Sequence, residues 1–189
     1  NGKLINEQEL VDETFNVRLT TPKMQRIVEI YQWDESSTTD DDGKTTYSYR
    51  KKWSSDIIDS SDFHQKNHEN PKTKQYEDET YTSTEVKVGA FNLSSDQIST
   101  LSTKGTFTNY DPEMLSKLNL TVSSSYLTTS KDLDNPQIGD IRISFVYNNS
   151  NDISVLAVQQ GSTFVTYISS YDKKINRVMD GTHSSKEII

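Results

Sequence analysis

The feature that most constrains this chain is a hairpin signal at Asp42-Gly43, a dipeptide that tolerates positive φ in a two-residue turn. A β-branched and aromatic segment precedes it at 24–33, and an aromatic segment follows it. We therefore predict a long aromatic hairpin over residues 27–53. Symmetric pairing about the turn sets opposite charges across the strands and leaves one mismatch at the base. The predicted pairs are Asp41 with Lys44, Asp34 with Lys51, Glu35 with Arg50 and Val28 with Ile57, and the mismatch is Glu29 with Asp56.

Length and composition limit the rest of the fold. The chain has 189 residues, 31% of them hydrophobic, and we expect residues 1–189 to form a single soluble domain with a thin, aromatic-rich core. The predicted class is α+β, mainly antiparallel β with long hairpins and two short helices that begin near Ser94 and Asp111. Further strands are predicted at 15–19, 80–93, 120–128 and 141–146, and a second hairpin at 153–168 around Gln160-Gly161.

The charge and the residue types exclude several classes of function. A formal net charge of −8 argues against nucleic acid and against broad contact with an anionic membrane surface. The absence of cysteine excludes a structural disulfide, a thiolate zinc site and a cysteine nucleophile. No apolar run approaches the roughly 20 residues that a membrane-spanning helix needs.

Two clusters have the residue types of a metal site. His64 and His68 stand four residues apart, a spacing that on a helix would place both on one face. The surrounding segment 64–74 is polar and contains Asn70-Pro71, so a solvated loop is the favoured interpretation. The run 40–43 lacks the alternating ligands of an EF-hand loop, which favours a solvated hairpin tip. Because the chain also lacks a nucleophile elbow and a phosphate loop, we expect no catalytic residue, no cofactor and no metal.

The aromatic side chains of the hairpin are the best candidates for an interaction surface. The alternative is ordinary packing against the core, which we favour for most of them. The turn Gly139-Asp140 is the other place where we expect contacts. The candidate surface comprises Tyr31, Trp33, Tyr47, Tyr49, Trp53, Gly139 and Asp140.

Several short motifs, in order, resemble the soluble domain of the LUMA family of multi-pass membrane proteins. The resemblance spans nearly the whole chain, and its specificity lies in the order of the motifs, since no single one suffices. The motifs are Ile30-Tyr31-Gln32-Trp33, Asp42-Gly43, Tyr47-Ser48-Tyr49 with Trp53, Ile57-Ile58-Asp59-Ser60 with Phe63, His68-Glu69-Asn70-Pro71, Val88-Gly89-Ala90-Phe91 with Leu93-Ser94, and Pro136-Gln137-Ile138-Gly139-Asp140-Ile141-Arg142-Ile143-Ser144-Phe145.

This resemblance implies a domain that lies between membrane segments outside the chain, on the extracytoplasmic or lumenal side. The Asn-, Ser-, Thr- and Lys-rich composition suggests a bacterial member in a cell envelope. The family transfers no catalytic residue, so the expected function is a non-enzymatic scaffold or sensor domain that binds protein partners or itself, with any small-molecule ligand unknown. One alternative is an envelope hydrolase that uses a carboxylate pair, or His68 with a nearby Asp. Another is a carbohydrate-binding module with Trp33 and Trp53 as an exposed platform.

Overall fold

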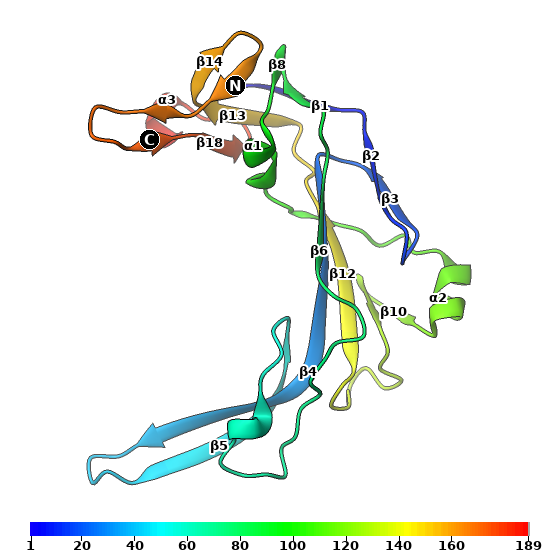
Figure 1. The fold of residues 1–189 in the computed structure, drawn as a ribbon. Helices are drawn as coiled ribbons and strands as arrows, with labels where there is room; N and C mark the ends of the chain where they lie inside the picture. Colours follow the sequence, from blue (N-terminus) through cyan, green and yellow to red (C-terminus); the bar gives the residue numbers. More distant parts are fainter. Residues whose placement is uncertain (189) are drawn as a thin grey trace. The chain divides into compact units, whose positions relative to one another are not determined.

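Strands make up most of the regular structure in the computed structural model, which describes residues 1–188 (Figure 1). The helices are short: α1 (Ser95–Ser99), α2 (Pro112–Leu118), α3 (Ser185–Ile188) and the 3₁₀ turn η1 (Ser60–Asp62). The α+β class predicted from the sequence is therefore wrong, because this is a mainly β chain. The antiparallel strands and long hairpins predicted with it are present, and α3 is an additional helix that was not predicted.

The chain divides into two compact units, each built from separate stretches of sequence. The first unit contains Asn1–Gln25, Thr80–Tyr110 and the chain from Phe145 onward, and the second contains Arg26–Glu79 and Asp111–Ser144. Strands β4 (Lys23–Thr39), β6 (Glu79–Thr82) and β12 (Ile141–Tyr147) continue along the chain from one unit into the other. The single-domain organisation stays a prediction, which limited proteolysis would test.

A seven-stranded sheet with the order β14-β15-β8-β7-β1-β13-β18 forms the centre of the first unit. Its pairs are antiparallel except β15 with β8, which is parallel. Smaller pairs are β2 with β3 and β16 with β17, and β9 pairs with β12. The strands are β1 (Gly2–Asn6), β2 (Glu9–Asp12), β3 (Val17–Thr20), β7 (Val86–Val88), β8 (Phe91–Asn92), β9 (Gly105–Thr106), β13 (Asp152–Leu156), β14 (Val158–Gln160), β15 (Thr163–Val165), β16 (Tyr167–Ile168), β17 (Lys174–Ile175) and β18 (Arg177–Asp180).

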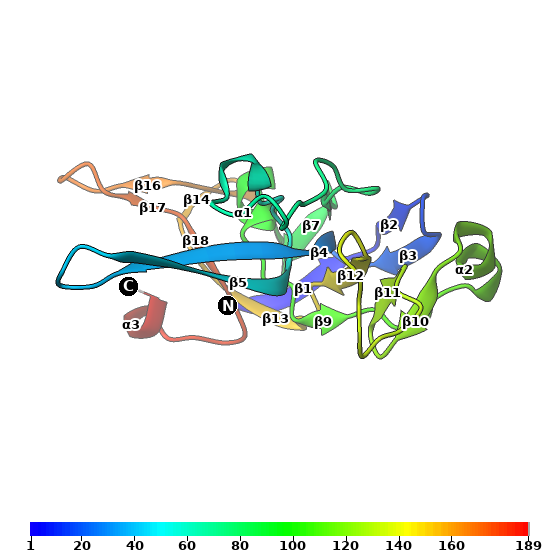
Figure 2. The same cartoon turned by 90° about the horizontal axis from the view of Figure 1, so that it is seen from below.

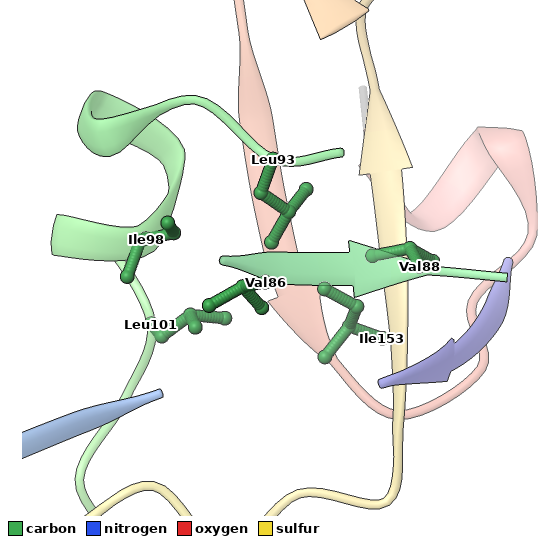
Figure 3. Packing of buried hydrophobic residues seen from close by; sticks show 6 residues of the cluster. All are labelled: Val86, Val88, Leu93, Ile98, Leu101 and Ile153. Atoms are coloured by element: carbon green, nitrogen blue, oxygen red, sulfur yellow. The ribbon is translucent and has the colours of Figure 1, made fainter. Parts of the chain in front are cut away.

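The core of the first unit forms where helix α1 packs on this sheet (Figure 3). Ser94 and Gln97 form a reciprocal capping box that starts the helix and directs Ile98 inward. The strand side of the core follows simple alternation, since Val86 and Val88 are buried and Lys87 between them is exposed. The buried members are Val86, Val88, Leu93, Ile98, Leu101 and Ile153.

The second unit contains most of a sheet with the order β10-β11-β12-β4-β5. The segment 120–128, predicted as one strand, is a tight hairpin of β10 (Thr121–Ser123) and β11 (Tyr126–Thr128). Ser124 adopts a positive φ of 54° at its turn, a conformation that the sequence signals poorly because Ser rarely adopts it. Helix α2 begins at Pro112 after the cap Asp111, as predicted, and ends at Leu118, where the C-cap Asn119 is left-handed.

Strands β4 and β5 (Thr45–Ser54) form the long hairpin predicted from the sequence (Figure 1). The predicted register is wrong by one residue, because Asp34 pairs with Arg50 and Glu35 with Tyr49. The cause is the turn, which is a three-residue loop in place of the expected two-residue one. Asp40 and Lys44 close it, and Gly43 occupies the left-handed position with φ 79°.

Candidate interaction surface on the first hairpin

The observed register places all five candidate aromatic residues on one face of the β4–β5 hairpin. Tyr31 pairs with Trp53, Trp33 with Lys51, Glu35 with Tyr49, and Ser37 with Tyr47. Paired residues share a face, and so do residues two apart along a strand. We call the surface formed by Tyr31, Trp33, Tyr47, Tyr49 and Trp53 the aromatic face.

Residues 56–78, here called the covering loop, pack on this aromatic face. The ring of His68 stacks on Tyr49 with centroids 3.8 Å apart and meets Trp33 edge-on at 4.5 Å. The ring of His64 stacks on Tyr47 at 4.1 Å. Each of the five aromatic residues is consequently half-buried. The two histidines, singled out as possible metal ligands, instead act as the rings that join the loop to the hairpin.

Two amide side chains, one on β4 and one in the covering loop, fasten the loop to β4. The side chain of Gln32 is fully buried, donates to the carbonyl of Asp56 at 2.6 Å and accepts from the amide of Ile58 at 3.0 Å. The side chain of Asn70 accepts from the amide of Trp33 at 2.7 Å and donates to the carbonyl of Trp33 at 2.9 Å. Asn70 therefore completes the edge of β4 as a neighbouring strand would.

The buried ammonium of Lys74 closes the base of the covering loop. It donates to the carbonyl of Ser55 at 2.7 Å and to that of Val28 at 3.2 Å. The carboxylates of Asp78 and Glu77 lie 3.7 and 3.8 Å from it. These contacts satisfy a charge that would otherwise be costly to bury.

A hydrogen-bonded group of Glu35, Tyr49 and the loop backbone marks the outer limit of the covered region. The hydroxyl of Tyr49 donates to the carboxylate of Glu35, and the amide of His64 donates to the same carboxylate at 2.7 Å. The hydrogen bond from Tyr49 is the main reason that the pKa of Glu35 lies below its ordinary value. Desolvation, followed by the bond to Glu35, raises the pKa of Tyr49.

A cation–π contact occupies the base of the aromatic face. The Arg142 guanidinium lies 4.8 Å from the Trp53 ring centroid and 5.7 Å from that of Tyr126. The same guanidinium binds both carboxylate oxygens of Glu29, at 2.5 and 2.9 Å. Tyr31 packs on Trp53 from the other strand with centroids 5.1 Å apart. Both tryptophans are thus in contact with neighbouring side chains, and both are half-buried.

The structure brings the second predicted contact point, Gly139-Asp140, next to the aromatic face. The amide of Tyr31 donates to the carbonyl of Asp140 at 2.8 Å, and the amide of Gly139 donates to the carbonyl of Tyr31 at 2.9 Å. Gly139 has a φ of 95°, which explains why glycine occupies this turn. The carboxylate of Asp140 accepts from the amide of Gln137 at 2.8 Å and so holds the turn itself.

Beyond Glu35 the hairpin continues as a two-stranded ribbon whose outer residues are exposed. The outward-facing backbone groups of Tyr47, Tyr49 and Lys51 on β5 have no hydrogen-bond partner among residues 1–188. Hydroxyl pairs link its strands, Ser36 with Ser48 at 3.1 Å and Thr39 with Thr45 at 3.0 Å. The ribbon therefore presents an open strand edge.

Charges on the opposite face of the hairpin are paired across the strands. The carboxylate of Asp34 lies 3.0 Å from the charged nitrogens of both Arg50 and Lys52. Burial raises the pKa of Asp34, but the hydrogen bonds from Lys52 and Arg50 outweigh it, so that the pKa is lowered overall. Charge pairing across the strands was predicted, with different partners because of the register.

The described residues offer little for metal or acid–base chemistry. Within 1–188, no group of three or more His, Asp or Glu side chains is placed to hold a metal ion. A pocket of about 610 Å³ opens beside η1 in the covering loop, lined in part by Asp59, Lys66, Glu69 and Lys72. Hydrogen bonds from Ser61 lower the pKa of Asp59, whereas a general acid needs a raised one. These hydrogen bonds favour the charged form of Asp59.

Sequence patterns did not identify the residues that hold the site together, Gln32, Asn70 and Lys74. All three have types that are usually exposed, and their roles depend on contacts with residues 12 to 46 positions away. The one local signal is Asn70-Pro71, which correctly indicated a loop but not its packing on the hairpin.

Comparison with known proteins finds relatives from one family along nearly the whole chain. Residues 30–189 match the family model for Transmembrane protein 43. Transmembrane protein 43 of Rattus norvegicus is 29% identical over 210 residues, which cover 99% of this chain and 51% of the relative. The Homo sapiens protein is 30% identical with the same coverage, and the Drosophila melanogaster homolog is 27% identical over 205 residues, 99% of this chain and 52% of its own. No solved structure matches the chain.

The chain spans about half the length of the relatives it matches. Within residues 1–188, no helix is long and apolar enough to cross a membrane. These relatives are animal proteins, so the expectation of a bacterial member finds no support. The family that the motifs pointed to as LUMA is the one that the family model matches, and this chain belongs to the Transmembrane protein 43 family of membrane proteins.

Proposed function

We propose that this chain is a non-enzymatic interaction domain of a membrane protein, exposed on the extracytoplasmic or lumenal side, which helps to organise membrane protein complexes. It would bind a protein partner, or a second copy of itself, through the open edge of strand β5 in hairpin β4–β5. The observation that carries this proposal is the open strand edge of β5, next to a hairpin base that the covering loop holds in place.

An open edge favours binding by strand addition. The outward-facing amides and carbonyls of β5 can pair with an extended segment of a partner, and alternating side chains then give specificity. Arg50, Lys51 and Lys52 place positive charge along this strand, and the tip carries the acidic run 40–42. A complementary partner segment would therefore have acidic residues opposite the strand and basic residues opposite the tip.

The covering loop supplies the preorganisation that such binding requires. Its amide anchors at Gln32 and Asn70 hold β4 up to the point where the free ribbon begins. A preorganised edge loses less conformational entropy on binding than a flexible one. The aromatic face is then the packing layer that fixes the hairpin, and the edge and tip form the contact.

The test is a single substitution on the open edge, Lys51→Pro, in the full-length protein in its own membrane. The Lys51 amide points away from β4, so proline leaves the β4–β5 pairing intact and removes one donor from the free edge. Lys51→Ala is the matched control, because it removes the charge and retains the amide. Crosslinking followed by mass spectrometry should show hairpin crosslinks to another protein chain that K51P weakens and K51A retains. Equal crosslinking in the two variants would rule out strand addition at this edge.

A further inference from the structure

Hairpin β16–β17 carries the two most exposed large apolar side chains of the described residues, Tyr171 and Ile168, together with the exposed Tyr167. Tyr167 is 47% exposed, Ile168 60% and Tyr171 85%. The three lie within five consecutive residues of the sequence. Figures 1 and 2 show the hairpin as a narrow extension at one end of the first unit. An exposed apolar cluster of this kind indicates a contact that the isolated chain does not make.

The geometry of the hairpin gathers these side chains with two lysines. Tyr167 pairs with Ile175 and Ile168 pairs with Lys174, so that Ile168 and Lys174 share one face of the hairpin while Tyr167 and Ile175 share the other. Tyr171 lies in the connecting turn, directly before Asp172 and Lys173. The apolar side chains and the ammonium groups therefore lie at the same end of the hairpin.

Backbone groups in the turn of this hairpin form hydrogen bonds within the turn. Ser169 exchanges hydrogen bonds within the turn, since its amide donates to the carbonyl of Lys173 at 2.9 Å and its carbonyl accepts from the amide of Asp172 at 3.0 Å. Its hydroxyl accepts from the amides of Lys173 at 3.1 Å and Tyr171 at 3.3 Å. A turn with few free amides loses little when it enters a less polar environment.

The local charge differs in sign from that of the whole chain. The stretch 167–175 contains Asp172, Lys173 and Lys174, a net charge of +1, whereas the chain carries −8. In the part of the chain that the structure describes, neither lysine forms an ion pair. Their ammonium groups are available to anionic headgroups, whereas the net charge of the whole chain disfavours a broad contact with an anionic membrane.

We propose that the β16–β17 hairpin contacts the surface of a lipid bilayer. Tyr167, Ile168 and Tyr171 enter the headgroup region, and Lys173 and Lys174 face anionic headgroups. Tyrosine prefers this boundary because its ring is apolar and its hydroxyl is polar, and lysine extends its ammonium group to the same level. The chain belongs to a family of membrane proteins, so a bilayer is the apolar surface at hand.

The size of the surface favours a bilayer over a second protein chain. Stable protein interfaces bury upwards of about 1,000 Å² with good complementarity, which three side chains on a two-pair hairpin do not supply. A bilayer contact needs no such area, because apolar side chains that enter the headgroup region and lysines that face anionic lipids each add to the binding free energy.

Vesicle flotation tests this proposal directly. The chain is mixed with vesicles of phosphatidylcholine, or of phosphatidylcholine with added phosphatidylserine, and the bound fraction is compared with that of Ile168→Ser/Tyr171→Ser. We expect binding that phosphatidylserine strengthens and that the double variant weakens by about tenfold or more, because it removes most of the inserted apolar surface. The matched control is Val122→Ser/Leu133→Ser, which removes two exposed apolar side chains elsewhere and should bind as the original chain does.

Two further readouts separate lipid binding from misfolding and from self-association. Lys173→Glu/Lys174→Glu should abolish the phosphatidylserine effect without changing the thermal unfolding midpoint. Tyr171→Trp should shift its emission to shorter wavelength when vesicles are added, which reports insertion even if the serine variant folds poorly. The proposal is overturned if the original chain does not float, if the control loses as much binding as the double variant, or if the double variant changes only the oligomeric state in sedimentation velocity.

Discussion

Hairpins β4–β5 and β16–β17 turn through the same three-residue loop but carry opposite chemistry. In the first, the amide of Gly43 donates to the carbonyl of Asp40 and the amide of Lys44 to the carboxylate of Asp40, at 3.0 and 2.8 Å. In the second, Asp172 and Lys173 donate to the carbonyl and hydroxyl of Ser169, at 3.0 and 3.1 Å. Both loops place their third residue in the left-handed region, Gly43 at 79° and Asp172 at 56°.

Because the turns are alike, their backbone conformation does not explain which side chains each tip carries. The first tip carries three acidic residues, 40–42, and a strand edge open to a partner. The second carries Ile168 and Tyr171, exposed, with two lysines. This difference in side chains is the basis of our two proposals, a protein partner for the first hairpin and a bilayer surface for the second.

The covering loop packs on hairpin β4–β5, and we expect the largest effect on stability when this packing is disrupted. Gln32→Ala removes the buried amide that binds the covering loop to β4 and leaves the amide of Ile58 and the carbonyl of Asp56 without partners. We expect a loss of about 2–4 kcal/mol in the free energy of unfolding, measured by urea titration with Trp fluorescence. Ser36→Ala, on the same face but exposed, should change it by less than about 0.5 kcal/mol. Similar losses in both variants would mean that the covering loop does not hold the hairpin.

The shared turn gives a prediction of intermediate size. Gly43→Ala forces a Cβ into the left-handed region and should destabilise the first turn by about 1–2 kcal/mol. Asp172→Gly at the matching position should change the second turn by less than about 0.5 kcal/mol, because Asp already tolerates this conformation and glycine gains freedom in the unfolded chain. Hydrogen exchange of the Asp40 and Ser169 amides, which close the two turns, measures each effect locally. Equal changes in the exchange rates of these two amides would contradict the conclusion that both turns need a left-handed third residue.

The smallest expected effect concerns the ion pairs of the first hairpin. Asp34→Asn should cost less than about 1 kcal/mol at neutral pH, where Asp34 is charged and bound to Arg50 and Lys52. The pKa of Asp34 is lowered in the folded state, so its contribution is present above the unfolded pKa and is lost as pH falls through the folded pKa. Urea midpoints of the two proteins should therefore differ at neutral pH and converge in strong acid. A difference that persists in acid would assign the effect to packing.

Sequence patterns predicted those features of the fold that depend on local chemistry. Asp42-Gly43 located the first hairpin, and the caps Ser94 and Asp111 located two helices. The register failed because Asp42-Gly43 fits a two-residue and a three-residue loop equally well, and the choice depends on the Asp40 side chain binding the Lys44 amide. A single such ambiguity moves every cross-strand pair by one residue.

The position of the candidate site could be predicted from the sequence, but the contacts that hold it together could not. The aromatic residues of the first hairpin were identified from their place in the two segments that flank Asp42-Gly43, and all five lie on one face as the register requires. Their burial depends on His64, His68 and the anchor Asn70, which lie in a polar loop with no periodic pattern. Such contacts join residues that are distant in the sequence, and no spacing pattern in the sequence indicates which of them meet.

The absence of cysteine makes the central comparison directly measurable, because Asp42→Cys and Tyr171→Cys each create a unique labelling site. Each tip is labelled with the same environment-sensitive fluorophore, and emission is recorded as vesicles of phosphatidylcholine and phosphatidylserine are added. We expect a shift to shorter wavelength for the label at 171 and no shift for the label at 42. A shift at both positions, or at 42 alone, would contradict the assignment of the two hairpins to different partners.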